Sequence, residues 1–149
     1  MISTVLALLL AATTAGQFAE KAKLRSGLPY DTRIIYSHLR FVMQNKKMAA
    51  VRLVDPTGVI VMVGGNSPTP KELPASPAAV LAMYMWVADG DDKMSFEADC
   101  KELGTGRVRC LFSKVSGGRL RTVPVTYINE RASITRIVVE APILGAPRG

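Results

Sequence analysis

Residues 94–140 have the sequence MSFEADCKELGTGRVRCLFSKVSGGRLRTVPVTYINERASITRIVVE, and this stretch decides the fold. At its start, every second residue is apolar or a cysteine: Met94, Phe96, Ala98 and Cys100. Polar residues fill the positions between them, a pattern typical of a β-strand with one buried face. Turn residues interrupt the stretch at Gly104–Gly106, Gly117–Gly118 and Asn129–Arg131. The stretch therefore predicts a four-stranded antiparallel meander.

The first turn also predicts a disulfide. Glycine supplies the positive φ that tight hairpin loops need, so a three-residue loop at Gly104–Gly106 pairs Leu103 with Arg107. This register places Cys100 directly opposite Cys110. Directly opposed Cβ atoms in a sheet are about 4.5–5.5 Å apart, and a disulfide needs about 3.5–4.5 Å. We expect a Cys100–Cys110 bond, with two buried free thiols as the alternative.

The second turn extends the same apolar face. A two-residue loop at Gly117–Gly118 pairs Cys110 with Val125. The run at 133–141 is expected to form the fourth strand, with Ile137 and Val139 pointing inward. The tail at 141–149 contains two prolines, and we expect it to be a loose end.

A second hairpin is predicted upstream. The segments Val51–Val54 and Val59–Val63, the second of which is apolar throughout, flank Asp55–Gly58, whose sequence DPTG has the residue preferences of a type I turn. The proline-rich stretch Gly64–Pro74 follows, and we expect it to be a surface loop.

Two longer segments are expected to be helical. Ser76 and Pro77 are typical of an N-cap and a first helical position, and Ala78–Ala88 is apolar on nearly all sides. That composition predicts the main helix packed on the sheet. Thr32–Asn45 fits either a helix or a strand by periodicity. We choose the helix, because of its length and because Asp31 is a good N-cap.

The N-terminus resembles a secretory signal. Met1–Ala19 has no charged side chain, and Val5–Ala12 is an apolar run followed by small residues. We expect a signal peptide at 1–16 and a single α+β domain at 17–149, beginning with a short helix at Gln17–Arg25. An uncleaved anchor is the alternative, but the apolar run is short for a span of about 20 residues. A periplasmic or secreted location would be oxidising and would favour the disulfide.

These elements together predict an α+β fold. We expect a curved antiparallel sheet of about six strands, made of the hairpin and the C-terminal four-stranded meander, with two or three helices on one face. This order of elements is similar to that of a cystatin-like or nuclear-transport-factor-like roll. The similarity is one of architecture, and a fold does not fix a function.

The formal net charge of +7 favours an anionic partner. Arg107, Arg109, Arg119 and Arg121 are the candidate anion-binding residues, although the predicted register does not put them all on one face. We expect the partner to be an anionic envelope component or another protein. Nucleic acid is not expected, because most aromatic residues are predicted to point inward. No stable membrane span is expected after cleavage.

No motif indicates catalysis, and we assign no catalytic residue, metal or cofactor. His38 is the only histidine in the chain, and one histidine cannot make a zinc site without further ligands. His38, Met83, Tyr84 and Trp86 are candidate pocket residues, because methionine adapts to apolar ligands and tryptophan offers a flat face and a donor. Ordinary core packing is the alternative for these residues.

The sequence thus favours an exported cell-envelope protein that acts as a non-enzymatic binding or interaction module with a basic surface. The alternative is a small-molecule-binding α+β roll, or an enzyme, with a pocket between the sheet and the Ala78–Ala88 helix. Whether the protein is an enzyme stays open at this point, with a non-enzymatic role favoured.

Overall fold

The computed structural model describes residues 28–64 and 69–147. The expected signal peptide at 1–16 and the expected helix at Gln17–Arg25 lie outside these residues. Within them, no helix has the length and apolar character that crossing a bilayer would require.

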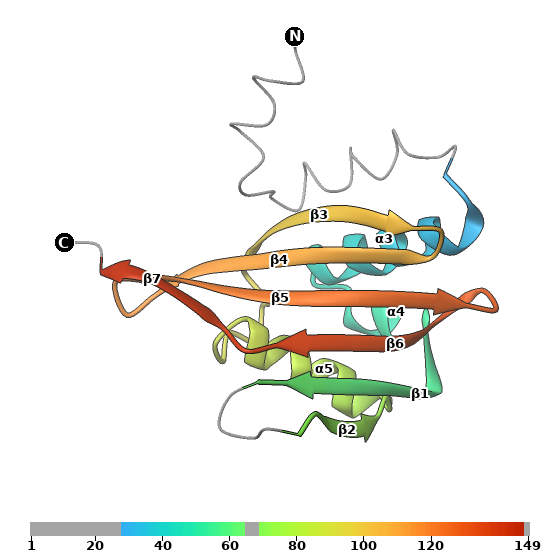
Figure 1. Cartoon of the computed structure of the whole chain (residues 1–149), viewed down its shortest axis with the longest axis horizontal. Helices are drawn as coiled ribbons and strands as arrows, with labels where there is room; N and C mark the ends of the chain where they lie inside the picture. The colour runs from blue at the N-terminus through green and yellow to red at the C-terminus, as the bar shows by residue number, and fades with distance from the viewer. Residues whose placement is uncertain (1–27, 65–68, 148–149) are drawn as a thin grey trace, which may run out of the picture.

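A curved seven-stranded sheet forms the body of the molecule, with helices lying on one of its faces (Figure 1). The strands are β1 (Val54–Val63), β2 (Lys71–Pro74), β3 (Glu97–Gly104), β4 (Arg107–Ser116), β5 (Arg119–Glu130), β6 (Ser133–Glu140) and β7 (Ile143–Pro147). Their order is β2-β1-β6-β5-β4-β3, and β7 pairs with β5. The helices are α3 (Tyr30–Met43), α4 (Lys47–Val51) and α5 (Pro77–Val87). The predicted α+β class is confirmed, with one correction: β1 and β6 run parallel, so the sheet is mixed and mostly antiparallel.

The meander follows the predicted register. Cys100 pairs with Cys110, and Cys110 pairs in turn with Val125. The two sulfurs form a disulfide, with the Cα atoms 4.0 Å apart. The first loop differs from the prediction, because Arg107 pairs with Gly104 instead of Leu103 and a bulge precedes the turn. Gly106 has a φ of +69°, as the glycine at such a turn requires. The inward face of the meander packs beneath the helices, and Ile137 and Val139 are fully buried.

The predicted upstream hairpin is wrong. Asp55–Gly58 lies within the single strand β1, where the register shifts between Val54 and Val59. The backbone N–H and the hydroxyl of Thr57 both donate to the Asp55 carboxylate, so the DPTG sequence makes a local bulge and not a chain reversal. The strand that returns beside β1 is β2, which lies in the stretch predicted to be a surface loop.

The C-terminal tail is also ordered, against the prediction. Strand β7 pairs with the first half of β5, where β6 no longer runs alongside. At the left of Figure 1, the ends of β4, β5 and β7 extend past the helices as a three-stranded arm. Proline does not break this strand, because Pro142 precedes it and Pro147 ends it.

Both longer helices are present. The structure confirms the helix predicted for the ambiguous segment Thr32–Asn45. The helix starts at Tyr30 with Pro29 at the N-cap, so Asp31 lies inside the first turn and is not the N-cap. Helix α5 begins as predicted, because the Ser76 hydroxyl accepts a hydrogen bond from Ala79 N–H at 3.2 Å.

Candidate functional site

A chain of three polar side chains lies at the centre of the core. His38 projects from α3, Tyr84 from α5 and Tyr127 from β5. His38 Nδ1 is 2.8 Å from the carbonyl oxygen of Ala50, and His38 Nε2 is 2.7 Å from the Tyr84 hydroxyl. The Tyr84 and Tyr127 hydroxyls are 2.5 Å apart. All three side chains are buried.

The direction of each hydrogen bond follows from the Ala50 carbonyl, which can only accept. His38 therefore carries its proton on Nδ1 and accepts at Nε2, so Tyr84 donates to His38. Tyr127 then donates to Tyr84. Burial lowers the pKa of His38 from 6.5 to about 4, against the smaller opposing effect of the bond to Ala50, so the imidazole is neutral at pH 7. Burial also raises the pKa values of Tyr84 and Tyr127.

This chain of hydrogen bonds holds elements of the core together. It contains no carboxylate, and its hydrogen bonds connect α3, α5 and β5. Of the other candidate pocket residues, Met83 is buried, whereas the Trp86 side chain is 39% exposed. The Arg121 guanidinium lies over the Trp86 ring, 4.9 Å from its centroid. The four candidates therefore do not line one shared cavity: His38, Tyr84 and Met83 face the core and Trp86 faces outward.

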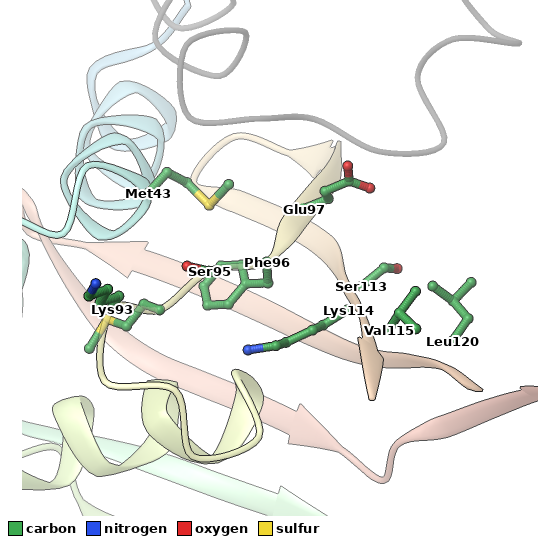
Figure 2. Close-up of a pocket in the computed structure, with 10 residues that line it drawn as sticks. Met43, Lys93, Ser95, Phe96, Glu97, Ser113, Lys114, Val115 and Leu120 are labelled. Carbon is green, nitrogen blue, oxygen red and sulfur yellow. The ribbon is translucent and has the colours of Figure 1, made fainter. Parts of the chain in front are cut away.

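A hollow of about 490 Å³ lies at another place, beside the end of β4 where β3 begins (Figure 2). Met43 from the end of α3 and the segment 93–97 form one side. Ser113, Lys114 and Val115 of β4, with Leu120 of β5, form the other. Its apolar lining residues are Met43, Met94, Phe96, Val115 and Leu120.

The charged residues of the hollow are partly balanced. Lys114 Nζ lies 3.0 Å from the Asp91 carboxylate and 3.0 Å from the carbonyl oxygen of Ala88. The hydrogen bond from Lys114, followed by that from the Lys93 backbone N–H, lowers the pKa of Asp91 to about 2. Lys93 and Glu97 also line the hollow, both exposed. The site therefore has an apolar surface with no large excess of either charge.

Comparison with known proteins identifies the architecture. No family model matches the sequence, and no curated protein matches it. An NTF-2 like protein of unknown function from Burkholderia xenovorans LB400 has a similar structure, with a TM-score of 0.53 at 11% identity over 80% of this chain and 86% of that chain. The chain has an NTF2-like fold.

Two further solved structures are similar to most of this chain. A loop truncation variant of IdmH has a TM-score of 0.54 at 16% identity, covering 76% of this chain and 91% of that chain. A protein from Sphaerobacter thermophilus has a TM-score of 0.51 at 14% identity, covering 75% and 94%. At these identities the likeness establishes the fold and leaves the function open.

The four candidate arginines lie on both faces of the NTF2-like sheet. Arg107 and Arg109 lie on the face away from the helices, and Arg109 contacts Glu140 at 3.3 Å. Arg119 and Arg121 lie on the helix-covered face by the alternation of β5. Arg121 donates to the carbonyl oxygen of Val87 at 2.7 Å, near the end of α5. The structure does not bring the four guanidinium groups together.

Sequence reasoning missed the residues of the hollow. No sequence motif marks its lining residues Lys93, Ser95, Lys114 and Leu120. These residues lie close together only because β3 separates from β4 at this place. Within residues 28–64 and 69–147, no three His, Cys, Asp or Glu side chains gather as a metal site would require.

Proposed function

We propose that the protein is a non-catalytic binding protein that holds a small, mainly apolar ligand in the hollow between the 93–97 segment and β4. The observation that carries this proposal is the hollow itself, with five apolar residues around about 490 Å³. Small-molecule sites commonly enclose about 300–1,000 Å³ with mostly apolar walls and a few polar groups.

Binding is favoured over catalysis by the position of the titratable groups. His38 is the only histidine and is sealed in the core by its bonds to Ala50 and Tyr84. In the hollow, Lys114 is engaged by Asp91. A general acid or base needs to reach the substrate within about 2.6–3.2 Å, or through one water, and His38 is not among the residues that line the hollow.

The test is a titration under native conditions with the fluorescent dye ANS, whose aromatic rings bind apolar surfaces. The wild-type protein should bind the dye saturably, and Val115→Glu should lose most of this binding. Leu103→Glu is the matched control, because both side chains are 53% exposed and both lie on meander strands, but only Val115 lines the hollow. Equal binding by the two variants, or no saturable binding by the wild type, would contradict the proposal.

A second candidate function is the basic interaction surface expected from composition. The observation in its favour is that Lys101 pairs directly across the strands with Arg109, beside Arg107, on the face of the sheet away from the helices. Like charges in this position repel, so an anionic partner would stabilise them. We expect salt-sensitive binding to vesicles containing phosphatidylglycerol, weakened by Lys101→Gln with Arg107→Gln. Vesicle binding that does not change with salt concentration or with these substitutions would rule out the basic interaction surface.

A further inference from the structure

Strand β4 extends past the start of its neighbour β3. The first pair between them is Glu97 with Ser113, yet β4 continues to Ser116. Residues 93–96 lead away from the sheet before this pair (Figure 2). Among residues 28–64 and 69–147, the end of β4 therefore has a strand neighbour on one side only, which is β5.

The backbone of Val115 points toward the side that β3 would occupy if it were longer. The Cα atoms of Cys100 and Cys110 are 4.0 Å apart, the short spacing of a non-hydrogen-bonded pair. The backbone N–H and C=O groups that face the β3 side therefore belong to alternate residues of β4, which are Arg109, Leu111, Ser113 and Val115. The Gly117–Gly118 turn assigns the same orientation to Val115. Ser116 and Arg119 close a two-residue hairpin and bond to each other, so the backbone of Ser116 faces β5 and that of Val115 faces the opposite side.

Val115 is the first of these residues without a partner in β3. Its N–H and C=O have no hydrogen bond to β3 or to another described residue on that side. Val115 also lines the hollow, so this donor and acceptor open into it. A peptide backbone offers the complementary acceptor and donor at the spacing of a strand.

The residues around the hollow fit the side chains of a peptide that pairs with Val115. Residues along an extended chain point alternately to the two faces of the sheet. On the helix side the hollow offers Phe96 and Met43, and on the other side it offers Val115 and Leu120. The charges largely balance, with Lys114 bound to Asp91. Uncharged, apolar side chains therefore match both walls better than an acidic or basic tail.

We propose that the ligand of the hollow is a short extended peptide segment with apolar side chains, which adds to the edge of β4 in line with β3. This inference rests on the proposed function and names the class of ligand. The main-chain bonds to Val115 supply the alignment, and the two apolar walls supply the preference for particular side chains.

The test is a selection of random heptapeptides displayed on phage against the folded, wild-type protein. We expect enriched peptides with apolar residues at successive positions. A synthetic copy should bind at least about tenfold more weakly to Val115→Pro, which removes the free N–H but no ladder bond. The circular-dichroism spectrum of this variant should match that of the wild type, which separates a lost pairing from a lost fold. A peptide methylated on the backbone nitrogen that faces Val115 should lose affinity for the wild-type protein, which tests the pairing without any substitution in the fold.

The outcomes separate the two proposals. Saturable ANS binding without any enriched peptide, or peptides that bind the wild type and Val115→Pro equally and tolerate methylation, would overturn the peptide inference and leave the proposed function standing. The absence of both dye and peptide binding would overturn both.

Discussion

The imidazole of His38 accepts a hydrogen bond from the hydroxyl of Tyr84 over 2.7 Å, and neither side chain is exposed to water. Because the other ring nitrogen donates to Ala50, only the neutral form of His38 satisfies both partners. Protonation would put a second donor opposite the Tyr84 hydroxyl in a buried site.

Stability should therefore fall as the pH is lowered from about 6.5 to 4. The folded pKa of His38 is depressed to about 4, so the unfolded chain takes up a proton in this range and the folded chain does not. The loss of unfolding free energy should reach about 3 kcal/mol. Urea denaturation at several pH values measures it. In His38→Gln, only the smaller dependence from carboxylates should remain, and an unchanged slope would contradict the prediction.

The two tyrosines of the core chain should differ in importance. Tyr84→Phe leaves both the His38 Nε2 acceptor and the Tyr127 hydroxyl without partners, at a cost of about 2–4 kcal/mol. Tyr127→Phe removes only the last donor of the hydrogen-bonded chain, and it should lower the free energy of unfolding by about 1 kcal/mol. Denaturant unfolding of the two variants gives the order of the two losses, and a larger loss in Tyr127→Phe would contradict the prediction.

The Cys100–Cys110 bond should stabilise one hairpin without holding the whole fold together. It closes a loop over a sequence separation of 10, for which the chain-entropy model gives somewhat under about 3 kcal/mol. We expect Cys100→Ala with Cys110→Ala to melt at a lower temperature but to stay folded at 25 °C. Reductant should lower the melting temperature of the wild type and leave that of the double variant unchanged. Unfolding of the variant at 25 °C would contradict this.

Trp86→Ala should cost about 1 kcal/mol, close to the value of its contact with Arg121. A buried tryptophan would cost about 3–5 kcal/mol, but the Trp86 ring lies partly in solvent. Chemical denaturation distinguishes these values. Arg121→Gln is the matched control for the ring contact, and a loss above about 3 kcal/mol for Trp86→Ala would indicate that the ring is buried by something beyond the described residues.

The N-terminal prediction needs its own measurement. If the protein is exported, its mature form should begin near Gly16 or Gln17. Mass spectrometry of the exported protein would show this directly. A form that retains Met1 would support the membrane-anchor alternative.

The meander could be predicted from the sequence because its signals are local. The glycine turns set the register, and alternation set the buried face, so two independent constraints agreed on Cys100 opposite Cys110. The N-cap at Ser76 is equally local. Each of these features depends on residues that are close together in the chain.

The larger failures concern long-range pairing. Asp55–Gly58 has the chemistry of a turn, but such chemistry specifies a bend and not the direction that the chain takes afterwards. Tail residues at 143–147 pair with β5 because β6 leaves its edge free, which no local pattern reveals. The site was missed for the same reason. Val115 looks like any strand residue until the start of β3 is known.

The parallel pairing of β1 with β6 has a consequence for the order of folding. Ile60 lies against Ile137, so the strand made early in synthesis must wait for one made near the end. Loop closure over such a separation is slow, whereas the hairpins of the meander close locally. We expect the meander to form first and to act as the template on which β1 docks. Until then the apolar run at Val59–Val63 pairs with β2 on one edge only, and a nascent chain halted before β6 would leave the other edge open to aggregation.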